Sequence, residues 1–401
     1  MIARIRSLPA WFRISARDPN RLVYMILAAT ALLYPTIVQF VNPEQSITLI
    51  NIAADAGVYV LMAIGLNVVV GFAGLLDLGY AAFFAIGAYT YAMLASGQLA
   101  LTPAHHAVHL PFWLLIFVAV LVAASAGALL GAPTLRLRGD YLAIVTLGFG
   151  EIVPRLFRNM SDWTGGVNAI SAIDAPLLPF WVDGPWDGGV PFAFVRDLKF
   201  SAFQPIGYYI LMALLILICI ILVTNLQRSR LGRAWMAVRE DELAASAMGV
   251  NTRNVKLLAF SIGAAFSGFA GCYFGAKLSS VSPENFSFLV SVTVLLMVTL
   301  GGMGNVPGVI VGAIVIYFVQ YKILGDLPHW TTAIAGGIGL PDKTVSALSD
   351  LATNLNFVVF GLILVVTMLL RPQGLVPSRQ RQEELTKGTH GGELVDMRGA
   401  S

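Results

Sequence analysis

The chain has 401 residues, of which 57% are apolar and only 12% are charged, and its formal net charge is +3. A soluble domain carries about 25% charged residues, so this chain has too few charges to cover a surface that faces water. The small net charge gives no reason to expect a nucleic-acid partner. The composition instead predicts an all-α, polytopic bundle of membrane-spanning helices.

Apolar segments of about 20 residues, the length that crosses a bilayer, recur along the chain. The first is longer than the apolar core of a cleaved signal peptide, so we expect it to remain as a membrane helix. The fifth and eighth are short and contain glycine, and we expect them to be broken or tilted. The ten predicted spans are 22–41, 49–70, 75–96, 112–132, 141–157, 206–225, 256–279, 286–301, 306–324 and 352–370.

Basic residues gather before the first span, in the loop 226–255 and after the last span. Short basic segments stay on the cytoplasmic side of a membrane protein, and ten spans place both termini there. We therefore predict a multi-pass protein of the bacterial inner membrane with both termini in the cytoplasm. Its predicted parts are a cytoplasmic segment 1–21, a transmembrane domain 22–371 with a periplasmic loop 158–205, and a flexible cytoplasmic tail 372–401.

The cytoplasmic loop 226–255 is charged, favours helix and is almost free of glycine and proline. Three large apolar residues, including Trp235, fall on one helical face. Asp241 can cap a second short helix, and Gly249 can end that helix in the left-handed conformation. The loop is therefore predicted to form two short helices.

Small residues follow Asp241, and the pair Ala244 and Ala245 would leave a flat face that enters a partner's groove. This pattern is typical of a coupling helix that is moved by a separate ATPase. The alternative is an amphipathic helix that rests on lipid headgroups. The candidate coupling residues are Arg233, Arg239, Glu240, Asp241, Glu242, Ala244, Ala245 and Gly249.

Three carboxylates, Asp55, Asp77 and Glu151, lie in or at the ends of apolar segments. Each would cost a few kcal/mol if it faced lipid at the centre of a helix, so we expect them to face the bundle interior or a hydrated path. Gly148 and Gly150 precede Glu151 and favour a break in the helix there. The candidate pathway residues are Asp77, Thr146, Gly148, Gly150 and Glu151.

No catalytic or metal-binding constellation is apparent. The segment 337–344 resembles a phosphate-binding loop only loosely, because Asp342 stands where such a loop needs glycine. His105 and His109 could share a helical face and bind zinc, but no carboxylate or cysteine lies near enough to complete four ligands. We expect no enzyme activity in this chain and no metal or cofactor bound by it.

The chain resembles the LivM-type permeases of bacterial branched-chain amino-acid ABC importers. Within the loop, Glu242, Ala244, Ala245 and Gly249 are similar to the pattern that importer permeases present to their ATPase. The stretches that carry the resemblance are 74–89 (GLLDLGYAAFFAIGAY), 139–151 (GDYLAIVTLGFGE), 164–168 (TGGVN), 229–251 and 300–308 (LGGMGNVPG).

The resemblance implies a complex of this chain with a LivH-like permease, two cytoplasmic ATPase subunits and a periplasmic solute-binding protein. ATP and magnesium would bind the ATPase subunits, and the pathway would carry branched-chain or similar amino acids. Alternatives are a permease for another small solute, such as urea, an amide or a carboxylate, and an ion-coupled secondary carrier. A carrier has no need of the loop 226–255, which favours the importer.

Overall fold

The computed structural model describes residues 19–337, apart from 103–104, 106–107, 136–139, 177–199 and 201–204, together with short stretches between 344 and 376. The α-helices are α2 (Pro19–Val41), α3 (Ser46–Leu66), α4 (Tyr80–Leu94), α5 (Gln98–Leu101), α6 (Phe112–Thr134), α7 (Asp140–Asn159), α8 (Ser161–Thr164), α10 (Ile206–Arg228), α11 (Arg230–Glu240), α12 (Glu242–Ala247), α13 (Thr252–Leu278), α14 (Phe288–Gly301), α15 (Val306–Tyr317) and α16 (Leu327–Gly337). Two π-helical segments, η2 (Asn67–Phe72) and η5 (Phe318–Leu324), continue α3 and α15, and two 3-10 turns are η3 (Gly166–Asn168) and η4 (Pro283–Phe286). The strands are β1 (Ala95–Ser96), β2 (Val108–His109), β3 (Ile170–Ser171) and β4 (Ser280–Val281).

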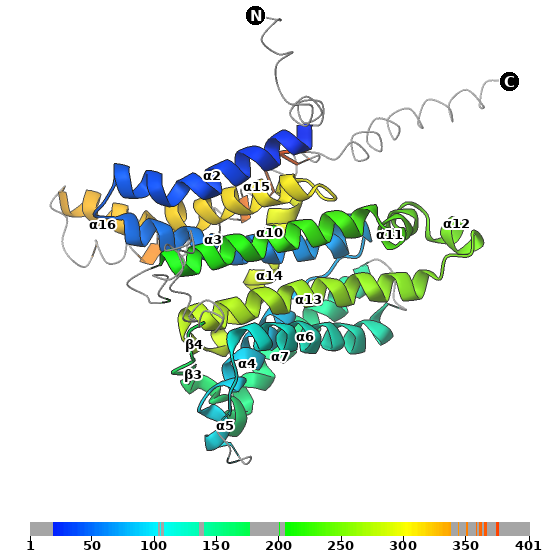
Figure 1. Cartoon of the computed structure of the whole chain (residues 1–401), viewed down its shortest axis with the longest axis horizontal. Helices are drawn as coiled ribbons and strands as arrows, with labels where there is room; N and C mark the ends of the chain where they lie inside the picture. Colours follow the sequence, from blue (N-terminus) through cyan, green and yellow to red (C-terminus); the bar gives the residue numbers. More distant parts are fainter. Residues whose placement is uncertain are drawn as a thin grey trace, which may run out of the picture.

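The long helices lie side by side with their axes roughly along one direction (Figure 1). Helices α11 and α12 project at one end of this bundle, which we call the α12 end. Strands β3 and β4 lie at the opposite end, which we call the strand end. The all-α prediction is confirmed for the part of the chain that the structure describes, where each strand has only two residues.

Helix α13 lies at the centre of the bundle, where it packs against α3, α4 and α6. At the contact with α4, a Cβ on Gly271 would overlap the carbonyl oxygen of Phe84 and lie 2.7 Å from the backbone nitrogen of Ala88. At the contact with α6, Gly127 lies against Ala264. Small residues therefore let the backbones of these helices approach closely, as they do in other membrane bundles.

Among the described residues, five helices are long and apolar enough to cross a membrane: α2, α3 with η2, α6, α10 and α13. Helices α4, α14 and α15 are apolar but shorter, and α7 has 20 residues but carries several charges. These nine helices coincide with the first nine predicted spans. The tenth predicted span, 352–370, lies mostly outside the described residues.

The third predicted span, 75–96, is interrupted, because helix resumes only at Tyr80. Helix α4 therefore has 15 residues, or about 22 Å, against about 30 Å for a hydrocarbon core. Tyr80 lies deep in the bundle, since its hydroxyl donates to the Gly263 carbonyl at 3.0 Å. Its own carbonyl accepts from the Ser267 hydroxyl at 3.2 Å, and both partners lie well inside α13. Residues 73–79 therefore run as non-helical chain from the surface, where Gly74 and Leu76 are exposed, to the buried Tyr80.

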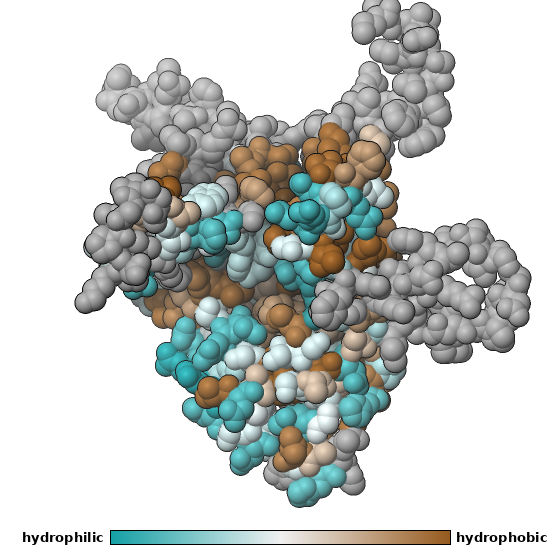
Figure 2. Space-filling view, turned by 90° about the vertical axis from the view of Figure 1, so that its left-hand side faces the viewer, coloured by the Kyte–Doolittle hydropathy of each residue, from teal (hydrophilic) through white to brown (hydrophobic). Residues whose placement is uncertain are grey.

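The strand end is closed by two short antiparallel pairings. Strand β1 pairs with β2, and β3 pairs with β4, which joins the segment after α8 to the end of α13. Figure 2 shows the molecule from this end, and the lower part of the visible surface is mainly hydrophilic. This end of the bundle therefore has the character of a surface that meets water.

Candidate functional site

The loop between α10 and α13 forms two short helices, α11 and α12, as predicted, and we call this pair the hairpin. The Ser229 hydroxyl caps α11 by accepting from the backbone nitrogen of Gly232 at 3.3 Å. The Asp241 carboxylate caps α12 by accepting from the backbone nitrogens of Leu243 and Ala244 at 2.8 and 3.0 Å. Gly249 lies just beyond α12 with φ at +86°. The caps predicted at Asp241 and Gly249 are therefore confirmed.

The hairpin is mounted firmly on the start of α13. Trp235 is fully buried, and its indole nitrogen donates to the Val255 carbonyl at 2.7 Å. Lys256 forms an ion pair with Glu242 at 2.6 Å, and its side chain is largely buried. A satisfied buried indole and a shielded ion pair hold the two short helices in one position relative to the bundle.

The alanine pair of α12 is divided between two environments. Ala245 is only 6% exposed and packs inside the chain, whereas Ala244 faces outward. Beside Ala244, the side chains of Leu243 and Met248 are 69% and 84% exposed. We call the outward group of Leu243, Ala244, Ala247 and Met248 the tip surface. We expected both alanines to form a flat outward face. Only Ala244 faces outward, and it lies beside the two large apolar side chains of Leu243 and Met248.

The charged coupling candidates also differ in direction, because some face outward and one faces the bundle. Arg233 is exposed and donates to the Arg228 carbonyl at 2.9 Å, and Glu240 is exposed. Arg239 turns inward, and its guanidinium donates to the Gly71 carbonyl at 2.5 Å. Its side chain covers Gly74, where an added Cβ would lie 2.8 Å from the Arg239 Cγ. Arg239 therefore ties α11 to the π-helical end of α3.

Two buried pathway candidates, Asp77 and Thr146, meet at the interrupted third span. Asp77 is buried, and its Oδ1 accepts from the backbone nitrogen of Gly79 at 2.9 Å. The Thr146 hydroxyl of α7 accepts from the backbone nitrogen of Leu78 at 3.1 Å and donates to the Ala143 carbonyl at 3.1 Å. Asp77 Oδ2 has no hydrogen-bond partner in the described structure. The structure therefore brings Asp77 and Thr146 together at non-helical backbone.

The break predicted in the fifth span is wrong, because α7 is continuous from Asp140 to Asn159. Gly150 instead serves close packing, since an added Cβ would lie 3.0 Å from the Cα of Gly79. A Cβ on Gly148 would meet no atom within 4 Å. Glycine is tolerated within membrane helices, so the glycines of α7 allow a contact without interrupting the helix. The interruption lies in the neighbouring chain at 73–79.

Glu151 does not join this group. Its carboxylate pairs with Arg155, one turn further along α7, at 3.0 Å, and both side chains are substantially exposed. Spacing along the helix places Gly148, Glu151 and Arg155 on one outward face of α7. The candidates of the fifth span therefore lie on two faces, with Thr146 and Gly150 inward and Gly148 and Glu151 outward.

Two features were not predicted from the sequence. Lys277 of α13 donates to Asp55 Oδ1 of α3 at 2.6 Å and to the Asn51 carbonyl at 3.0 Å, so the carboxylate singled out in the second span has a cationic partner. Asn67 is fully buried in η2, and its side-chain oxygen accepts from the backbone nitrogen of Gly304 at 2.8 Å. The sequence signals that could have revealed them are Lys277 near the end of the seventh predicted span and Asn67 within the second.

No group of three histidine, cysteine, aspartate or glutamate side chains that could hold a metal occurs in the described part of the chain. His109 instead pairs with Asp174 at 2.6 Å, at the strand end. Cys219 and Cys272 are free and buried.

Residues 48–368 match the protein family described as "Branched-chain amino acid transport system / permease component". The chain is 42% identical over 352 residues to the high-affinity branched-chain amino acid transport system permease protein LivM of Escherichia coli (strain K12), covering 86% of this chain and 73% of that relative. It is 26% identical over 352 residues to a probable LivM of Methanocaldococcus jannaschii, covering 80% and 91%. It is 25% identical over 322 residues to the permease protein LivH of Escherichia coli (strain K12), covering 79% and 91%. No solved structure was found to match the chain.

Proposed function

The chain belongs to the family of branched-chain amino acid transport system permease components, and from this premise we propose that it is a pathway-forming subunit of an ATP-driven importer of branched-chain amino acids. As a transport subunit it performs no chemical step itself. ATP and magnesium would bind separate subunits, and this chain would bind no cofactor.

The observation that carries the proposal is the tip surface. Exposed Leu243 and Met248 lie on a helix that is fixed to the bundle through Trp235 and Lys256. A small apolar surface on a rigid support is suited to docking a partner, because it contributes buried area without first having to be ordered. We assign this surface to an ATPase subunit, which would move the bundle by pushing on the hairpin.

The complex would contain a second, LivH-like permease, two cytoplasmic ATPase subunits and a periplasmic solute-binding protein. The similarity of this chain to LivH supports a related permease as its partner. The pathway would pass between the two permeases, along the outward face of α7 that carries Gly148 and Glu151. Residues 73–79 with Asp77 and Thr146 would form the support behind that face.

In the bacterial inner membrane, the α12 end would face the cytoplasm and the strand end the periplasm, with both termini in the cytoplasm. Single cysteines at exposed Ser246 and Glu44, in a protein without Cys219 and Cys272, test this orientation. An impermeant thiol reagent added to intact spheroplasts should label position 44 and not position 246. Labelling at position 246 would show that the orientation is the opposite of the one proposed.

Uptake by the reconstituted complex tests the function. The complete importer in proteoliposomes, with ATP inside and the solute-binding protein outside, should accumulate leucine and should not respond to a dissipated ion gradient. Urea, amides and simple carboxylates should not compete. Leucine uptake that needs an ion gradient but no ATP would identify a secondary carrier, and competition by urea would identify a different solute.

A further inference from the structure

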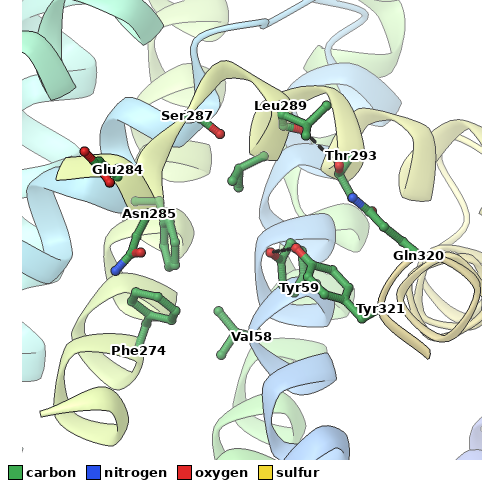
Figure 3. Close-up of a pocket in the computed structure, with 12 residues that line it drawn as sticks. Val58, Tyr59, Phe274, Glu284, Asn285, Ser287, Leu289, Thr293, Gln320 and Tyr321 are labelled. Carbon is green, nitrogen blue, oxygen red and sulfur yellow. Dashed lines mark hydrogen bonds between the residues drawn. The ribbon is translucent and has the colours of Figure 1, made fainter. Parts of the chain in front are cut away.

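A cavity of about 260 Å³ lies between α3, α13, α14 and η5, toward the strand end of the bundle. Figure 3 shows Tyr59, Tyr321 and Gln320 on one side of it and Phe274, Glu284 and Asn285 on the other. It lies away from the tip surface, toward the other end of the bundle, and none of the residues that line it is a candidate named above.

The cavity is large enough for a small organic molecule. A cavity of about 150 Å³ in another protein holds benzene, which has six heavy atoms. The present cavity therefore has room for a molecule of about nine heavy atoms, the size of leucine. Much of its wall is apolar and aromatic, with Val58, Tyr59, Phe84 and Phe274 among the residues that line it. Such a wall suits a hydrocarbon side chain.

The polar side chains on the inner wall of the cavity are not available to a bound molecule. The side-chain oxygen of Gln320 is buried and has no hydrogen-bond partner in the described structure. The Thr293 hydroxyl on the same wall is already used, since it donates to the Leu289 carbonyl at 2.8 Å. Both polar groups on this wall are therefore closed to a solute, and a charged solute has to be recognised at the edge of the cavity.

Both signs of charge are present at the mouth of the cavity. Glu284 lines it, and just beyond the lining residues the guanidinium of Arg158 lies 3.7 Å from the Glu284 carboxylate. This separation is too long for a hydrogen bond, and both side chains are more than half exposed. Each charge can therefore take a further partner. Asn285 adds an uncharged amide beside them.

We propose that this cavity binds the zwitterion of an apolar amino acid before it crosses the membrane. The ammonium of the solute contacts the Glu284 carboxylate, its carboxylate contacts the Arg158 guanidinium, and its hydrocarbon side chain lies against Tyr59 and Phe274. The inference rests on the proposed function, because it takes the solute to be an amino acid with an apolar side chain. It gives the permease a solute contact of its own, in addition to that of the solute-binding protein.

Equilibrium binding of tritiated leucine to the complete complex in lipid nanodiscs, without solute-binding protein or nucleotide, tests the proposal. We expect saturable binding that Glu284→Gln weakens at least about tenfold, because one charge-assisted contact is lost without a change in size. The matched control is Glu44→Gln, which removes an exposed carboxylate elsewhere at the strand end and should leave the affinity unchanged. Absence of saturable binding, or equal affinities of Glu284→Gln and wild type, would overturn the site.

A ligand comparison on the unmodified complex keeps the proposal testable if Glu284→Gln does not fold. 4-Methylpentanoate is leucine with a hydrogen in place of its ammonium, so it should bind at least about tenfold more weakly than leucine. In Glu284→Gln this preference should disappear. Equal binding of the two ligands to wild type would show that the cavity takes only an apolar group, such as a lipid chain, and would overturn the proposal.

Uptake measured in parallel separates the two inferences. ATP-driven leucine uptake without leucine binding to the nanodisc complex would contradict the cavity site and leave the importer function intact. Leucine binding without ATP-driven uptake would contradict the importer function and leave the cavity site intact.

Discussion

Helices α2 and α13 are both apolar enough to cross a membrane, but they occupy opposite kinds of place in the bundle. In the most apolar stretch of α2, 6% of the residues are buried inside the bundle. In that of α13, 61% are buried. The main difference in sequence is side-chain size. Helix α13 contacts its neighbours through glycines such as Gly268 and Gly271, whereas α2 presents large residues such as Leu32 and Phe40.

The comparison teaches that apolar character and small side chains carry different information. Lipid tails are as apolar as leucine, so hydropathy places a helix in the membrane without choosing its neighbours. Close approach needs small residues, and these select which helix becomes the centre. The bare face of α2 is open to lipid or to another subunit.

The largest effect should come from enlarging a side chain at the centre of the bundle. Gly271→Leu would drive a side chain into the backbone of α4, and overpacking against backbone atoms costs about 3 kcal/mol. We expect little folded protein by size-exclusion chromatography in detergent. The matched change on α2, Ala29→Leu at an exposed position, should leave yield and melting temperature unchanged. Equal yields of the two variants would remove the distinction between the helices.

The same contrast between buried and exposed sites operates within α12. Ala245→Glu buries a carboxylate inside the hairpin, which costs several kcal/mol unless a cation pairs with it. We expect the hairpin to detach, so that limited proteolysis cleaves within 226–255 and the ATPase subunit no longer copurifies. Ala245→Ser should resemble wild type. A protease-resistant loop in Ala245→Glu would contradict the burial of this position.

On the exposed side of α12, Leu243→Asp should have a narrower effect. Leu243 is 69% exposed, so the isolated permease should keep its proteolysis pattern and melting temperature. Affinity for the ATPase subunit should fall at least about tenfold, because a charge enters the apolar centre of the proposed contact. If binding and ATP-driven uptake are both retained, the hairpin is better interpreted as a membrane-surface helix.

The next effect concerns the link between the hairpin and the bundle. Arg239→Ala removes the hydrogen bond to the Gly71 carbonyl, and such a bond from a charged donor contributes about 1.5–3 kcal/mol. We expect normal ATPase binding but less leucine transported for each ATP hydrolysed. Arg239→Lys should restore part of the ratio. An unchanged ratio in Arg239→Ala would limit the residue to structural support.

The smallest effect on stability is expected at Glu151. Its pair with Arg155 is exposed, and exposed pairs of this kind contribute about 0.5 kcal/mol or less. Glu151→Gln should therefore leave assembly intact and change the kinetics of uptake, if the outward face of α7 lines the pathway. Uptake kinetics identical to wild type would assign Glu151 to packing against a neighbouring subunit.

The parts of the structure that the sequence predicted are those that depend on local chemistry. The first nine spans follow from apolar length, and the caps at Asp241 and Gly249 follow from side-chain oxygen and backbone freedom. The pairing of Asp55 with Lys277 was not predicted, because these residues lie 222 positions apart and meet only after α3 packs on α13.

The interruption at 73–79 was misplaced for a related reason. Glycines near Glu151 were interpreted as a break, but their neighbours in space decide what they do, and Gly150 contacts Gly79 of another span. Likewise, Ala244 and Ala245 look alike in sequence, and only the packing of α12 on α11 and α13 determines which of them is buried.

The short α4 bears on how the protein is made. A helical segment of about 22 Å with non-helical chain before it cannot cross a bilayer alone, because backbone amides between Leu78 and the start of α4 would meet hydrocarbon without partners. Hydrogen bonds from α7 and α14, through Thr146 and Ser291, satisfy some of these groups and the start of α4. Both partners are synthesised after α4. During translation the nascent third span must therefore stay within a protein-lined or hydrated environment until Ser291, 210 residues beyond Ala81, has been added, so the insertion machinery has to retain it rather than release it to lipid.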